Sequence, residues 1–198
     1  MWDLSKEQTD VAIFWFVTEL RSQVRFAAAA ARHMDAAMRR VVADQTEAID
    51  DLFVGLHGLV AAGGNVSKLL WPTPQHPSSV DRLHSLERGT MLRTLFNIDN
   101  TSPLRLDGLR EVVEHFDEYL DRTVEASRGG FSALMINVVL DTENAVAATD
   151  GTVLHWGRVC IMEPATLRVF GHDLDIRALL QAMTELDSLA AQWLAVAI

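Results

Sequence analysis

The chain has 198 residues, of which 49% are hydrophobic and 22% are charged, and these proportions are typical of a packed globular protein rather than a disordered one. Its net charge of −10 argues against a broad electrostatic surface for nucleic acid, so any contact with RNA is expected to be local. The single cysteine, Cys160, excludes an internal disulfide.

The first predicted element is a long helix over residues 5–42. Ser5 and Gln8 have the spacing of a capping box, and the stretch that follows contains no Gly or Pro, with Arg32 as the point of any break. The apolar run at residues 11–17 is shorter than the ~20 residues that cross a membrane, and no charged leader with a cleavage site precedes it. We therefore expect a cytoplasmic protein with no membrane partner.

Two more helices are predicted in the first half of the chain. Residues 44–62 carry apolar side chains at helical spacing, and the Gly-Gly-Asn sequence at 63–65 predicts the end of that helix. Three prolines predict a loop over residues 71–77. A serine cap then predicts a third helix over about residues 78–96.

A fourth predicted helix, over residues 104–126, carries the candidate site. Its apolar residues define one narrow stripe that is expected to face the core: Leu109, Val112, Val113, Phe116 and Leu120. At about 100° per residue, Arg110 lies roughly 100° to one side of this stripe and His115 roughly 120° to the other. The two side chains are then about 140° apart, so a second copy of the helix is expected to bring an arginine and a histidine to one target.

The pattern changes after this helix. Apolar, partly β-branched stretches follow, and residues 152–162 and 166–170 flank Glu163-Pro-Ala165 in the manner of a short hairpin. Asp173 is the predicted N-cap of a final helix that extends to about Val196.

These elements predict a mainly α fold: a helical bundle of about four to five helices with a small β-hairpin element before the C-terminal helix. We expect one domain over residues 1–198. Its helical core covers about residues 5–126, and the β element and C-terminal helix cover about residues 131–198.

The segment Arg110-Glu-Val-Val-Glu-His115 has the Arg-x4–6-His spacing of the HEPN family. The longer stretch from Leu109 to Asp121 resembles the motif helix of HEPN-type bacterial proteins, and the family also has a helical bundle. Many of its members are metal-independent endoribonucleases or toxins. The resemblance therefore implies that the chain binds RNA or a nucleotide and cleaves RNA. Active members often carry Asn, Asp or His after the arginine, where this chain has Glu111.

The chemistry that the resemblance implies follows from these side chains. Cleavage of RNA without a metal needs a group that accepts the 2′-hydroxyl proton near neutral pH, and imidazole is the side chain suited to that step. The resemblance assigns this role to His115 and assigns the scissile phosphate to Arg110. Glu111 and Tyr119, each four residues from His115, are expected to orient the imidazole or to stabilise its charged form.

The resemblance also implies partners. These are a second copy of the chain, whose motif lines the same cleft, RNA and, for a toxin, a cognate nucleotidyltransferase-like antitoxin. No metal or cofactor is expected, because the sequence has no metal-ligand spacing and no nucleotide-binding glycine motif. The alternative is a non-catalytic helical subunit that acts in interaction or regulation. In that case Arg110 forms a surface ion pair with Glu114, and His115 is a surface or interface histidine without chemistry.

Overall fold

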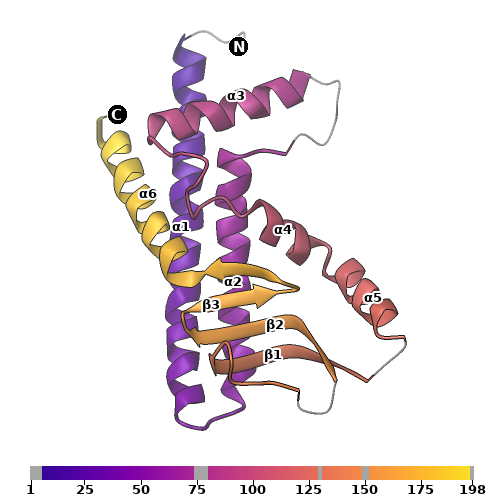
Figure 1. The fold of residues 1–198 in the computed structure, drawn as a ribbon. Coiled ribbons are helices and arrows are strands. Elements are labelled where there is room, and N and C mark those ends of the chain that lie inside the picture. The colour runs from indigo at the N-terminus through magenta and orange to yellow at the C-terminus, as the bar shows by residue number, and fades with distance from the viewer. Residues whose placement is uncertain (1–5, 74–79, 129–130, 149–151, 197–198) are drawn as a thin grey trace. The chain divides into compact units, whose positions relative to one another are not determined.

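The structure is a computed structural model that describes residues 6–73, 80–128, 131–148 and 152–196. Figure 1 shows the elements of these ranges. In chain order they are α1 (Lys6–Val42), α2 (Ala48–Leu70), α3 (Val80–Leu95), α4 (Asp107–Glu114), α5 (Phe116–Ala126), β1 (Ser132–Thr142), β2 (Val153–Glu163), β3 (Thr166–Val169), β4 (His172–Asp175) and α6 (Ile176–Val196). None of the helices in these ranges is long and apolar enough to cross a membrane.

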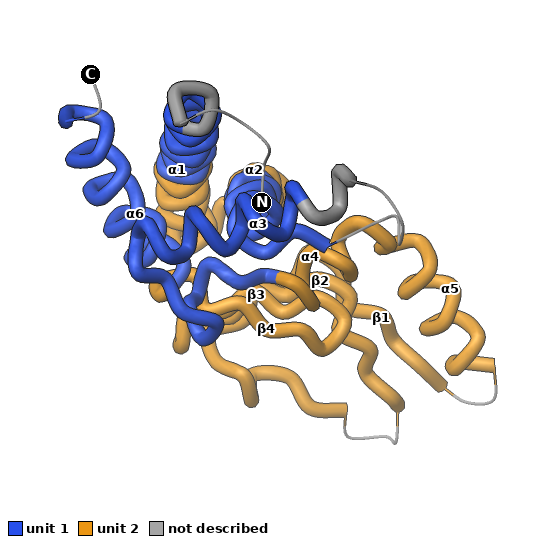
Figure 2. The backbone as a smooth tube through the Cα atoms, turned by 90° about the horizontal axis from the view of Figure 1, so that it is seen from above, with its two compact units in different colours: residues 1–29, 58–106, 179–198 blue, residues 30–57, 107–178 orange. Residues whose placement is uncertain are grey.

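The chain forms two compact units, which Figure 2 colours separately. Unit 1 comprises residues 1–29, 58–106 and 179–198, and unit 2 comprises residues 30–57 and 107–178. The helix α3 belongs to unit 1, whereas α4, α5 and the whole sheet belong to unit 2. Each unit contains residues from before and after residue 126, which is the boundary predicted from the sequence between the helical core and the β element. The single domain stays a prediction.

The fold class predicted from the sequence is wrong. In place of a bundle of four to five helices with a hairpin, the described ranges contain six helices and a four-stranded mixed sheet in the order β1-β2-β3-β4. The predicted hairpin is present, because β2 and β3 pair antiparallel. However, β1 pairs in parallel with β2, and β4 adds an antiparallel fourth strand. The two eleven-residue strands β1 and β2 supply enough apolar surface for a sheet with its own core of Leu140, Val159 and Ile161.

The start of the last helix also differs from the prediction. Asp173 lies in β4, where its carboxylate accepts hydrogen bonds from Arg168 at 2.7 Å. The N-cap is Asp175, whose Oδ1 accepts a hydrogen bond from the N–H of Ala178 at 2.9 Å. Both aspartates have a side chain suited to a helix cap. Because the pairing of β4 with β3 extends to Asp175, the helix begins after Asp175 and not after Asp173.

The two long helices show where local sequence rules hold and where packing overrides them. The helix α1 is continuous past Arg32, as its lack of Gly and Pro allows. Its capping residue, Ser5, lies outside the described residues. The helix α2 starts at Ala48, four residues later than predicted, and continues through Gly63 and Gly64 to Leu70. The predicted end at 63–65 is therefore wrong.

The reason for this continuation lies in unit 1. A Cβ on Gly63 would lie 2.9 Å from Leu106 Cδ1 and 3.3 Å from Leu179 Cδ2. Both leucines are buried. Their burial against the bare backbone of α2 offsets the cost of glycine in a helix, which is about 1 kcal/mol relative to alanine.

Two irregularities of the sheet shape unit 2. The register between β1 and β2 shifts around Asn137, whose φ is +55°, and Gly157 on β2 leaves room for Ile136 Cγ1, which would lie 3.1 Å from a Cβ there. The turn from β3 to β4 consists of Phe170 and Gly171, with φ of +44° and +83°. Two positive φ values are typical of a type I′ hairpin turn, and this turn fixes the position of the Phe170 ring.

Candidate functional site

The helix predicted over residues 104–126 begins at Asp107 and is interrupted at His115, so the candidate motif lies at a junction between two helices. His115 has backbone angles φ −115° and ψ 37°, outside the helical range. Its N–H still donates to the carbonyl oxygen of Glu111 at 2.9 Å, and its own carbonyl accepts the N–H of Tyr119 at 3.2 Å. The prediction of one continuous helix is wrong, and the angular separation calculated for a straight helix no longer applies.

The ring of His172, which lies on β4, packs on both of the helices that meet at His115. The His172 Nδ1 atom would be 3.1 Å from a Cβ on Gly108 of α4, so glycine is what allows this approach. The ring of His172 also meets the ring of Tyr119 on α5 edge-on, with centroids 6.2 Å apart. The imidazole of His172 therefore connects α4 to α5 on either side of the interruption, which Figure 1 shows as a short non-helical segment between the two helices.

The imidazole of His115 is accessible. Its side chain is 52% exposed, and Nδ1 lies 3.1 Å from Oε1 of Glu118, one helical turn further along α5. This partner differs from the two that the sequence suggests, Glu111 and Tyr119. Glu111 is exposed, and the ring of Tyr119 packs against the ring of Phe170. As the N-cap residue of α5, His115 makes no side-chain capping hydrogen bond.

Arg110 lies on α4, five residues before His115, and is half-buried. Its Nη1 atom is inaccessible to solvent. The helix α4 buries Leu109 and Val112, which places Arg110 at the border between that apolar face and solvent. Within one chain the hydrogen-bond partner of the His115 ring is Glu118, so the structure does not join Arg110 and His115 directly.

An aromatic cluster, formed by Phe116, Tyr119 and Phe170, holds α5 in place. The Phe170 ring in the β3–β4 turn lies 5.0 Å from the Phe116 ring and 5.7 Å from the Tyr119 ring, measured between centroids. No residue of α5 is fully buried, so these half-buried rings make the main contacts between this helix and the strands.

Two arginines cover the outer rings of the aromatic cluster. The guanidinium of Arg158 on β2 lies 4.8 Å from the Phe116 ring centroid, and that of Arg122 on α5 lies 5.0 Å from the Tyr119 ring centroid. Arg122 also forms an ion pair with Glu118 at 3.4 Å. Cation–π contacts of this length favour the positive charge, so the acidic chain carries two ordered cations beside the junction.

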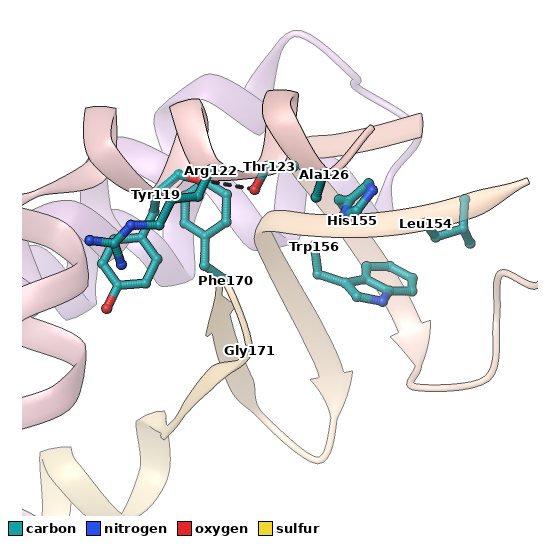
Figure 3. A pocket seen from close by; sticks show the side chains of 9 residues that line it. All are labelled: Tyr119, Arg122, Thr123, Ala126, Leu154, His155, Trp156, Phe170 and Gly171. Carbon is teal, nitrogen blue, oxygen red and sulfur yellow. Dashed lines mark hydrogen bonds between the residues drawn. The ribbon is translucent and has the colours of Figure 1, made fainter. Parts of the chain in front are cut away.

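A pocket of about 340 Å³ opens between α5, the start of β2 and the β3–β4 turn, all within unit 2 (Figure 3). Its lining consists of Tyr119, Arg122, Thr123, Ala126, Leu154, His155, Trp156, Phe170 and Gly171. The volume is at the lower end of the range for small-molecule sites. The lining contains four aromatic rings if the imidazole is included, one permanent cation and no carboxylate.

The network around His155 fixes the tautomer of this imidazole. Ser127 Oγ donates its hydrogen to the carbonyl oxygen of Thr123 at 2.8 Å. The same Oγ lies 3.3 Å from His155 Nε2, and because its hydrogen is already used it must accept there. The neutral ring therefore carries its hydrogen on Nε2 and keeps Nδ1 as an acceptor.

Tyr119 is the one residue of this pocket that was predicted from the sequence as a site residue, and its predicted role was to orient the imidazole of His115 or stabilise its charged form. Arg122 and Phe170 were not identified because the lining comes from three segments far apart in sequence. The only local signal was the pair of Tyr119 and Arg122 on one helix, three residues apart, which places them on one face. The alternation of β2 offered no hint that His155 and Trp156 face a helix.

The described part of the chain contains no group of three or more His, Cys, Asp or Glu side chains placed to hold a metal ion. The arrangement instead offers an exposed imidazole, ordered arginines and stacked rings. These groups suit proton transfer, anion binding and stacking respectively.

The HEPN resemblance rests on the residues around the junction alone. It implied a helical bundle, in place of which the described ranges contain six helices and a four-stranded mixed sheet. No protein-family model, curated protein or solved structure matches this chain.

Proposed function

We propose that this chain binds RNA through unit 2 and cleaves it without a metal, with His115 and Arg110 at the cleaved phosphate. The observation that carries the proposal is the half-exposed imidazole of His115, held at the start of α5 by Glu118. Because Nδ1 faces the carboxylate, Nε2 is the nitrogen left to accept the proton of a 2′-hydroxyl. The 2′-oxygen then attacks the adjacent phosphorus, the bond to the 5′-oxygen breaks, and the leaving 5′-oxygen takes a proton from water while the imidazolium returns its proton to solvent. The products are a 2′,3′-cyclic phosphate and a 5′-hydroxyl.

The start of α5 supports phosphate binding at the same point. Because His115 makes no side-chain capping bond, the N–H groups of the first turn are not used by that residue. N–H groups in the first turn of a helix favour a bound anion in general. Asp117 and Glu118 in this turn oppose an anion, so we assign the balance of charge to Arg110.

The proposal includes a homodimer, as the HEPN resemblance implies, in which two copies of the α4–α5 junction line one cleft. Each copy would supply one Arg110 and one His115. For a toxin of this kind, the resemblance also implies a nucleotidyltransferase-like antitoxin as the physiological partner.

Cleavage of total RNA in the presence of EDTA tests the catalytic step. We expect the rate with His115→Ala to fall by about 10²- to 10⁴-fold, the usual contribution of a general base. His33→Ala is the matched control, because this histidine is also exposed on a helix and its replacement should leave the rate unchanged. Equal cleavage by wild type and His115→Ala, or no cleavage by the wild type, contradicts the proposal.

The second candidate function is the non-catalytic interaction subunit. It is favoured by large apolar side chains exposed on α1, since Trp15 is 69% exposed and Phe26 is 61% exposed. Exposed aromatic residues of this size often mark protein contacts. If this function holds, the chain self-associates through α1. Replacing Arg110 or His115 then changes neither the self-association of the chain nor the state of any RNA incubated with it.

A further inference from the structure

The pocket beside α5 has aromatic side chains at both of its ends. Figure 3 shows Tyr119 and Phe170 at one end and His155 and Trp156 at the other. Contacts outside the pocket hold two of these rings in position. Phe170 lies in a tight turn with positive φ, and Trp156 packs against the core of the sheet. Rings held at both ends of a cavity favour a flat ligand that stacks on them.

The charge of the lining indicates an anionic ligand. The chain has 27 acidic and 17 basic residues, yet the lining includes no carboxylate and one permanent cation, Arg122. His155 adds an acceptor nitrogen, because its Nε2 is used by Ser127. A flat ring with hydrogen-bond donors and an attached anion would be complementary to the aromatic rings, to His155 and to Arg122.

The pocket is connected to the proposed cleavage site through one carboxylate. Oε1 of Glu118 lies 3.1 Å from Nδ1 of His115, and Oε2 of the same residue lies 3.4 Å from Nη2 of Arg122. The three side chains therefore form a line along α5. Tyr119, which starts the pocket, is four residues from His115, a rise of about 6 Å along the helix. A nucleotide next to a phosphate held at His115 is within reach of the pocket.

We propose that this pocket is a nucleobase subsite. The base of a ribonucleotide stacks on the rings of the lining, and its phosphate is bound by Arg122. The inference rests on the proposed function in one respect: it takes this base to belong to the nucleotide beside the phosphate at His115. The chemistry that it requires, a purine or pyrimidine base joined to a phosphate, is shared by a free mononucleotide and by a residue of RNA.

Isothermal titration of the whole chain with adenosine 5′-monophosphate tests the subsite without RNA. We expect binding of one mononucleotide per chain, with ribose 5-phosphate bound at least about tenfold more weakly, because it lacks the stacked base. Ala126→Phe fills the pocket from an exposed helical position and should weaken binding by about tenfold or more. Val124→Phe is the matched control, since it is exposed on the same helix outside the lining and should change nothing.

A second variant identifies the phosphate contact. Arg122→Gln should weaken adenosine 5′-monophosphate and leave adenosine unchanged. Two results would overturn the subsite: equal affinity of Ala126→Phe and wild type for the mononucleotide, or equal affinity of the wild type for ribose 5-phosphate and the mononucleotide.

Parallel titration with a short single-stranded RNA separates the two sources of the ligand. If RNA binds and Ala126→Phe weakens it in step with the mononucleotide, the base belongs to bound RNA. If the mononucleotide binds in the pocket and RNA does not, the RNA function fails while the subsite stands as a site for free nucleotides. If RNA binds and no mononucleotide does, the subsite fails while the RNA function stands.

Discussion

At the scale of single residues, the environment of a side chain decides its chemistry. Cys160 lies in β2 and is buried, and burial raises the pKa of its thiol to about 11. The thiolate is the reactive form of cysteine. Cys160 is therefore held as a small apolar core residue at neutral pH, in contrast to His115, which the bend between two helices leaves open to solvent.

This burial predicts a pH dependence of stability. The folded pKa of Cys160 is raised from 9.0 to about 11, so the thiol favours folding fully below about pH 9 and loses this contribution as the pH rises to 11. The free energy of unfolding should fall by about 2 to 3 kcal/mol across that interval. Urea unfolding at several pH values measures it, and Cys160→Ala should lack this part of the decline. Parallel curves for the two proteins would contradict the assignment.

At the scale of elements, close contacts of α2 depend on glycines, which are otherwise unfavourable inside a helix. A Cβ on Gly55 of α2 would lie 2.9 Å from the backbone nitrogen of Met34 on α1, within unit 2. Gly63, in unit 1, faces the ends of leucine side chains at a similar distance. A backbone atom cannot move aside, whereas a leucine end can rotate, so two glycines in one helix have different requirements.

Replacement by alanine is expected to have different effects on stability at the two glycines. Gly55→Ala should lower the free energy of unfolding by about 1 to 3 kcal/mol, because the overlap exceeds the gain in helix propensity of about 1 kcal/mol. Gly63→Ala should lie within about 1 kcal/mol of the wild type, since the leucine ends can adjust. Thermal unfolding followed by circular dichroism measures both. A greater loss for Gly63→Ala than for Gly55→Ala would show that the leucines cannot adjust.

At the scale of the whole molecule, the net charge of −10 opposes RNA unless cations are concentrated. Unit 2 places Arg122 and Arg158 over aromatic rings beside the junction. Two copies of such a surface would double the local positive charge, which is a physical reason to expect a dimer for the proposed function.

The dimer predicts a measurable mass. Light scattering of the purified chain should give twice the 22.0 kDa of one chain, and Arg110→Ala and His115→Ala should not change it, because neither side chain belongs to the core. Trp15→Arg separates the two candidate functions: it should lower the mass toward the monomer if the exposed face of α1 is the contact, and leave the mass unchanged if the α4–α5 junction is the contact. A monomer at all working concentrations would contradict both candidate functions.

Several features of this protein follow from the sequence alone. The absence of Gly and Pro predicts the uninterrupted α1, and the β-branched stretches around Glu163-Pro-Ala165 predict the hairpin of β2 and β3. These are local properties, because helix propensity, turn chemistry and periodicity act within a few residues. The stripe of the fourth predicted helix likewise placed His115 away from the core, where the structure has it exposed.

Only the tertiary structure decided the features on which the candidate site depends. The two helices that meet at His115 both contact His172, from a strand far along the chain, which packs on Gly108 and on Tyr119. The parallel pairing of β1 with β2 and the pocket that ends at Phe170 are also contacts between distant segments. Such contacts leave no periodic signal in the sequence, since each depends on surfaces that exist only after the elements have formed. The sequence thus identified the imidazole, and the fold determined what surrounds it.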